Sequence, residues 1–106
     1  MDRLVERLSV EGQDIVVGGP SPSVEEFHHR LTELKYVFLK FTGTRGGTDL
    51  GVRVDDATDL GTADFTTATG NVHVEGTLTL NFQPVRCIAD IDLTTLTGTG
   101  HLTPAD

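Results

Sequence analysis

The stretch NVHVEGTLTLNFQPVRCIADIDL, residues 71–93, decides the fold that we predict from this sequence. Apolar side chains occupy its even positions as far as Phe82 and, after Pro84, its odd positions. The apolar set is Val72, Val74, Leu78, Leu80, Phe82, Val85, Cys87, Ala89, Ile91 and Leu93. Alternation with period two is typical of strands with one buried face. Since one change of parity across a chain reversal keeps both sets on one face, the stretch predicts an antiparallel hairpin that turns near Gln83 and Pro84.

Other segments, working outward from this hairpin, have strand patterns, and one has a helical pattern. Strands are expected within 9–17, 35–41, 50–55, 64–69 and 95–102. The segment KYVFLKF is apolar at nearly every position, which indicates a strand covered on both faces. A helix is expected from about Ser23 to Leu34, because Ser23 and Glu26 have the spacing of a capping box and apolar residues then recur at helical spacing.

These elements predict a mainly β (α+β) fold. It is an antiparallel meander of six to eight strands with one early helix packed on it. The pattern leaves open whether the sheet closes into a small barrel, because closure depends on the pairing of its two ends.

The size and charge of the chain narrow the classes of function. Its 106 residues predict a single domain, 1–106, and its 12 glycines favour strands and tight turns. The net charge of −8 repels nucleic acid and anionic membrane surfaces, so neither is an expected partner. Cys87 is the single cysteine, and its place in the buried set predicts a small hydrophobe rather than a reactive thiol. No segment has the character of a signal peptide or a membrane span, so a cytoplasmic protein is expected.

Three segments suggest a bound ion or phosphate and fail on inspection. The segment FTGTRGGTDLG, residues 41–51, lacks the lysine and the following helix of a phosphate loop, so we interpret it as a hairpin turn. The acidic segment 55–64 lacks the spacing of a calcium loop. The adjacent His28 and His29 point about 100° apart on a helix, and His28 is expected to pack its ring beside the apolar face. No metal and no cofactor are therefore expected.

The polar face of the hairpin supplies the candidate site. With the turn placed as above, Glu75 lies directly opposite Asp92, and two facing carboxylates repel unless a cation or a shared proton intervenes. In a pocket, the pair would titrate as a coupled acid and base with His73 beside it. On a water-facing sheet the repulsion would be screened, or Arg53 would neutralise it. The candidate catalytic residues are Glu75, Asp92 and His73, and the candidate ligand-binding residues are Arg53, Arg86 and Asp90.

The segments FTGTRGGTDLGVRVD and VEGTLTLNFQPVRCIADIDLTTLTGTGHL resemble a group of small, uncharacterised actinobacterial all-β proteins that accompany natural-product biosynthesis. The resemblance covers the C-terminal two-thirds of the chain and consists of Thr-Gly punctuation and a long hairpin. It implies a setting in secondary metabolism and carries over no catalytic residue.

Two hypotheses follow for the function. In the first, the protein binds a small, largely apolar metabolite as a cofactor-independent cyclase or isomerase, a reaction that needs shape, exclusion of water and one or two acid/base groups. In the second, it is a non-catalytic interaction or accessory module whose negative charge selects a basic partner surface. A homodimer is compatible with both hypotheses. The sequence leaves open whether the protein is catalytic.

Overall fold

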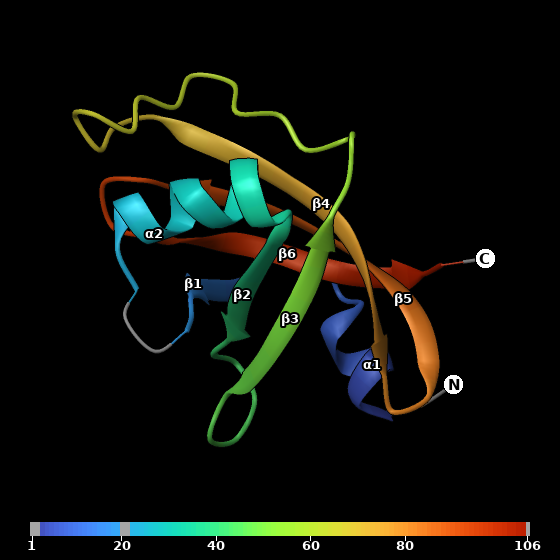
Figure 1. Ribbon diagram of the computed structural model, residues 1–106. Coiled ribbons are helices and arrows are strands. Elements are labelled where there is room, and N and C mark those ends of the chain that lie inside the picture. The colour runs from blue at the N-terminus through green and yellow to red at the C-terminus, as the bar shows by residue number, and fades with distance from the viewer. Residues whose placement is uncertain (1–2, 20–21, 106) are drawn as a thin grey trace.

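The computed structural model describes residues 3–19 and 22–105, and within them six antiparallel strands close into a small barrel (Figure 1). The strands are β1 (Gln13–Val17), β2 (Tyr36–Phe41), β3 (Thr48–Val54), β4 (Asn71–Leu80), β5 (Gln83–Asp92) and β6 (Thr97–Pro104). Each strand pairs with its neighbour in the chain, and β1 pairs with β6. The predicted fold class is confirmed, and the ladder that contains Gln13 and Gly100 closes the sheet.

The helix predicted near the N-terminus is present. α2 (Val24–His29) continues into a π-helical turn, η1 (Arg30–Leu34), so the helical segment ends where the spacing predicts. The Ser23 hydroxyl accepts a hydrogen bond from the Glu26 backbone N–H at 3.0 Å. This bond satisfies one of the backbone donors that a helix start leaves without a partner.

A second, shorter helix, α1 (Arg3–Leu8), was not predicted. Its sequence signal is the helical spacing of Val5 and Leu8, which are both buried. Figure 1 shows α1 near the tip of the β4–β5 hairpin, whereas α2 crosses the barrel close to the loop that follows β3. Within the described residues, no helix is long and apolar enough to cross a bilayer.

The turn of the β4–β5 hairpin lies two residues earlier than predicted. It consists of Asn81 and Phe82, whose φ angles are 48° and 67°. A two-residue turn of type I′ requires positive φ at both positions, and asparagine tolerates this conformation better than most residues. The turn predicted near Pro84 is therefore wrong, and Pro84 instead lies at the second position of β5.

The earlier turn changes the register but keeps the faces. Glu75 faces Ile88 instead of Asp92, a shift of four residues along β5. An even shift preserves which side chains point inward, because side chains alternate with period two. The prediction of burial fails for Phe82, which is fully exposed at the turn, and Leu78 and Leu80 are only partly buried.

The inward side chains fill the barrel. Those of β4 and β5 include Val72, Val74, Val85, Cys87, Ala89 and Ile91, each 0% exposed. Buried residues of α1 and α2 belong to the same cluster, so the helices extend the core beyond the strands. Because the protein's own side chains occupy the interior, a ligand would have to bind at the surface of the barrel.

The strand β2 is less covered than predicted. Its burial alternates along the strand instead of including every residue. Tyr36 on the outward face is 39% exposed, so the expectation of cover on both faces is wrong there. Phe38, on the same face, is partly covered by the guanidinium of Arg30, which lies 4.7 Å from the ring centroid.

The connections on either side of β3 differ in length. Within the glycine-rich segment 41–51, residues 42–47 form the short loop between β2 and β3, where Gly46 and Gly47 have φ angles of 76° and 77°, so the predicted turn is confirmed. Residues 55–70 form the longer link from β3 to β4.

That longer link contains a tight turn in place of a predicted strand. Asp64 and Thr69 form an isolated bridge across the turn, so the strand predicted at 64–69 is wrong. Phe65 stacks on His28 with 4.1 Å between the ring centroids. The packing predicted for His28 is confirmed, and this contact holds the loop against α2.

The wall of the barrel is incomplete between β3 and β4. Within the described part of the chain, these strands pair at two positions, Arg53 with Thr77 and Val54 with Gly76. The β2–β3 ladder has six such pairs and the β4–β5 ladder has ten. A tight turn fixes the register of each of those hairpins, whereas the long link between β3 and β4 does not. Beyond Thr77 the two strands diverge.

Candidate functional site

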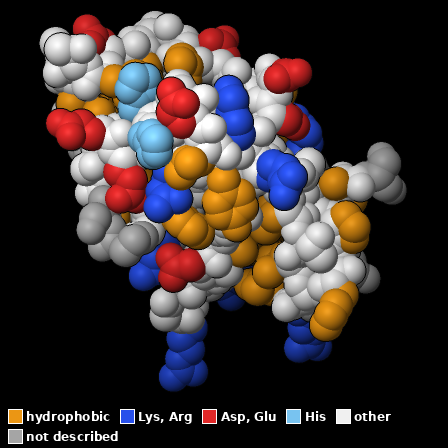
Figure 2. Space-filling model, viewed as in Figure 1, with side chains coloured by type: hydrophobic (Ala, Val, Ile, Leu, Met, Phe, Trp, Pro, Cys, Tyr) orange, Lys and Arg blue, Asp and Glu red, His pale blue; other side chains and the backbone are white. Residues whose placement is uncertain are grey.

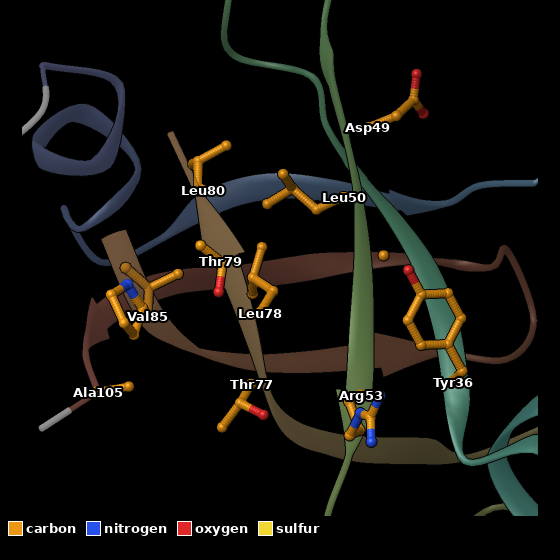
Figure 3. A pocket seen from close by; sticks show the side chains of 12 residues that line it. Tyr36, Asp49, Leu50, Arg53, Thr77, Leu78, Thr79, Leu80, Val85 and Ala105 are labelled. Atoms are coloured by element: carbon orange, nitrogen blue, oxygen red, sulfur yellow. The ribbon is translucent and has the colours of Figure 1, made fainter. Parts of the chain in front are cut away.

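A crevice of about 710 Å³ opens where β3 and β4 diverge. Its apolar lining comes from Leu50, Leu78, Leu80 and Val85, and polar side chains at its margin come from Tyr36, Asp49, Arg53, Thr77 and Thr79. Figure 3 shows Leu50, Leu78 and Leu80 in the gap between the two strands. Figure 2 shows hydrophobic side chains gathered on this face of the molecule. Ligand sites of about 300–1,000 Å³ commonly combine such an apolar floor with a few polar groups.

Tyr36 lies at one side of the crevice, over β3. A side chain at Gly51 would collide with the hydroxyl and ring of Tyr36, so the absence of a Cβ allows the ring to lie across the strand. The ring also contacts Phe38 edge-on, at 5.5 Å between centroids. The Tyr36 hydroxyl has no hydrogen-bond partner among the described residues, so it is available to a ligand.

Two cations lie beside Tyr36. Arg53 faces Tyr36 across the β2–β3 ladder, and the backbone carbonyl of Lys35 accepts a hydrogen bond from the Val54 N–H at 2.9 Å. Lys35, Tyr36 and Arg53 line a second depression of about 480 Å³ that adjoins the crevice. Both cations are exposed, and their side chains have no carboxylate partner within residues 3–19 and 22–105. We call Lys35 and Arg53 the cationic end of the crevice.

A chain of five charged and titratable side chains crosses the outer surface of β4 and β5. His73 Nδ1 lies 2.8 Å from an oxygen of Asp90, and His73 Nε2 lies 2.6 Å from an oxygen of Glu75. The guanidinium of Arg86 donates to Glu75 at 2.9 and 3.1 Å. It also donates to both oxygens of Asp55, at 2.7 and 3.2 Å. We call these residues the ion-pair chain.

The ion-pair chain favours the charged form of its members. Hydrogen bonds that His73 donates to Asp90 and Glu75 raise the pKa of His73. Hydrogen bonds with His73 and Arg86 lower the pKa of Glu75, and the bond from Arg86 lowers the pKa of Asp55. Each shift has the direction expected when an opposite charge lies within bonding distance.

The structure brings four of the predicted site residues together and separates the other two. His73, Glu75, Arg86 and Asp90 belong to the ion-pair chain, whereas Arg53 lines the crevice. Asp92 lies at the end of β5, where it faces Asn71 and accepts a hydrogen bond from the Thr94 N–H at 2.8 Å.

The predicted opposition of Glu75 and Asp92 is therefore wrong, because it depended on the wrong turn. In the observed register, His73 faces Asp90 directly. The cation beside Glu75 is Arg86 rather than Arg53. Arg53 therefore has no carboxylate partner among residues 3–19 and 22–105.

The ion-pair chain also contains three residues of types that bind metals. Each nitrogen of His73 is directed at a different carboxylate, Asp90 on one side and Glu75 on the other, so the three side chains do not converge on one point. Among the described residues, no group of three or more histidine, cysteine or acidic side chains is arranged to hold a metal ion.

Sequence reasoning missed three residues of these sites. Asp55 was expected only as the end of a strand and the start of an acidic segment, although its position directly after β3 is a signal that it could reach a neighbouring strand. Tyr36 and Lys35 were treated as strand residues. Their role depends on the divergence of β3 from β4, which no local pattern reveals.

Searches with the sequence found no matching protein-family model and no similar curated protein. The resemblance to actinobacterial proteins of natural-product biosynthesis therefore stays a prediction.

Proposed function

We propose that this protein binds a small, largely apolar molecule in the crevice between β3 and β4. The observation that carries the proposal is the exposed apolar floor. Leu78 and Leu80 belong to the inward-facing row of β4, yet they are only partly buried, because β3 does not cover them. Covering partly exposed leucines with an apolar ligand removes their surface from water, which is favourable in proportion to the area buried.

The margin of the crevice supports a specific ligand over a general hydrophobic contact. Hydroxyl groups of Tyr36, Thr77 and Thr79 border the apolar floor. A small number of such groups orients a ligand, because a polar group that loses water on binding must find a partner.

The proposal is one of binding, and the cyclase or isomerase activity stays a prediction. The acid/base residues predicted for that activity are not among the residues that line the crevice. His73 and Glu75 bond to each other and to other members of the ion-pair chain, and Asp92 bonds to a turn. None of these contacts supports an acid/base role in the crevice.

The fluorescence of Tyr36 tests the proposal directly, since the chain has one tyrosine and no tryptophan. Titration with decanol, below the concentration at which it separates from water, should change this fluorescence saturably. The variant Leu80→Glu places a charge on the apolar floor and should weaken decanol binding about tenfold or more. Val10→Glu is the matched control, because Val10 is 61% exposed and does not line the crevice. Absence of saturable binding, or equal binding by Leu80→Glu, would contradict the proposal.

The second candidate is a non-catalytic interaction module. The observation that favours it is Phe82, which is fully exposed and has a φ of 67°. An aromatic residue held in this conformation at a hairpin tip is unusual, and such outliers occur often at functional sites. Self-association through Phe82 is the form of this candidate that can be tested with the protein alone. A concentration-dependent dimer in analytical ultracentrifugation that is lost in Phe82→Ser would support this candidate, and a monomer at all concentrations would exclude self-association.

A further inference from the structure

We infer that the ligand of the crevice carries a carboxylate, which binds at the cationic end while its apolar part covers the leucine floor. This inference rests on the proposed function, because it names the chemical class of ligand for the same crevice. The class is a single-chain or single-ring carboxylic acid with one acidic group. The residue that selects it is Arg53.

Arg53 is available because Arg86 bonds to the carboxylates closest to it in the sheet. Asp55 follows Arg53 by two residues, and Glu75 precedes Thr77, the cross-strand partner of Arg53, by two residues. Both carboxylates accept hydrogen bonds from Arg86. A carboxylate held by a guanidinium gains little by turning to another cation, so the ion-pair chain leaves Arg53 without a competitor for a ligand.

The other charges of the crevice orient the ligand. Asp49 is the acidic residue in the lining, and it lies four residues from Arg53 along β3, roughly 13 Å in an extended strand. Figure 3 shows the Asp49 carboxylate directed away from the gap and Arg53 at the opposite end. A carboxylate is therefore repelled at one end of the crevice and attracted at the other. Asp56 shares a third depression with Lys35 but forms no ion pair among the described residues.

The donor geometry fits a carboxylate better than a neutral polar group. A guanidinium presents parallel N–H donors that match the two oxygens of a carboxylate, and the hydroxyl of Tyr36, which lies over Gly51 at the margin of the crevice, is a further donor. A hydrogen bond to a charged group contributes more to binding than a neutral one. We therefore expect a ligand with the same apolar chain to bind more tightly as an acid than as an alcohol.

The test compares decanoate and decylamine, each below its critical micelle concentration, with decanol below its solubility limit, by the fluorescence of Tyr36 and by calorimetry. At neutral pH, decanoate should bind the wild-type protein about tenfold or more tightly than decanol, and decylamine should bind most weakly. Arg53→Gln should reduce the ratio of decanoate affinity to decanol affinity to about one. Arg53→Lys keeps the positive charge but not the two parallel N–H donors of the guanidinium, so it should retain part of the advantage of decanoate over decanol. Arg45→Gln removes the same charge from an exposed position that does not line the crevice and should have no effect.

The outcomes separate this inference from the proposed function. If decanol binds and decanoate binds no more tightly, the crevice is a site for apolar molecules and the inference is wrong. The same conclusion holds if Arg53→Gln keeps the full advantage of decanoate. If neither compound binds, both the inference and the proposed function are wrong. Circular dichroism of each variant establishes that the comparison is made between folded proteins.

Discussion

The ion-pair chain makes a quantitative prediction about stability through Arg86. This guanidinium donates four hydrogen bonds, two to Glu75 and two to Asp55. Exposed ion pairs contribute about 0.2–1 kcal/mol in double-mutant cycles, and the Asp55 side chain, 36% exposed, belongs to that class. The side chain of Glu75 is 21% exposed, so its bonds to Arg86 approach the value of about 1.5 kcal/mol for charged hydrogen bonds. We expect Arg86→Gln to lower the free energy of unfolding by about 2 kcal/mol.

In a domain of this size, that loss should lower the Tm by about 8–10 °C. Urea unfolding at neutral pH, followed by circular dichroism, measures the change in free energy with an unchanged m-value. Arg45→Gln is the control, because it removes the same charge from an exposed loop residue with no ion pair in the described part of the chain. Asp55→Asn in both backgrounds isolates the coupling of Asp55 with Arg86, expected at about 1 kcal/mol. A loss below about 0.5 kcal/mol in Arg86→Gln, or an equal loss in the control, would refute the reasoning.

Three further predictions concern single residues. The pKa of His73 is raised, so the stability that its ion pairs contribute is complete below its ordinary pKa of 6.5 and is lost as pH rises through the raised pKa. The pKa of Glu75 is lowered, so the stability that its ion pairs contribute is complete above its ordinary pKa of 4.5 and is lost as pH falls through the lowered pKa. The loss of stability in His73→Gln, relative to wild type, should therefore be largest between pH 4.5 and pH 6.5. Thermal melts that show an equal loss at about pH 9 would contradict this prediction. Phe82→Gly should raise the free energy of unfolding by about 0.5 kcal/mol, because the relief of positive φ exceeds the added backbone entropy of the unfolded chain; destabilisation would indicate that Phe82 is packed in solution. Burial raises the pKa of the Cys87 thiol to about 12, so a thiol reagent should label it only when the protein unfolds, and rapid labelling of the native protein would show that the core opens.

The inward and outward faces of the central hairpin could be predicted from the sequence, but its register could not. The alternation of apolar residues in β4 and β5 correctly assigned the inward-facing residues of these strands, since a four-residue shift leaves the faces unchanged. Pro84 was the stronger turn signal in the sequence, yet Asn81 and Phe82 form the turn. Because of this error, Asp92 was predicted as the β5 carboxylate beside His73 and Glu75, whereas the structure places Asp90 there.

The helix at α2 was predictable because its evidence is local. Ser23 and Glu26 specify where the helix begins, and the buried face follows from the spacing of its apolar residues. The short helix α1 has a weaker version of the same signal in Val5 and Leu8, and its burial depends on contact with the distant strands. Short helices gain most of their stability from such contacts rather than from their own sequence.

The sequence by itself determined the class of fold, the position of the main helix and the faces of the hairpin, because these depend on periodicity and capping within a few residues. Only the tertiary structure decided that the sheet closes, since closure joins β1 to β6 across most of the chain. It also decided the site. Residues 55–70 leave β3 and β4 without a short turn to align them, so the strands diverge after Thr77 and expose the leucine floor beside Arg53. Such a gap results from the pairing of distant strands in three dimensions, and no pattern of neighbouring residues encodes it.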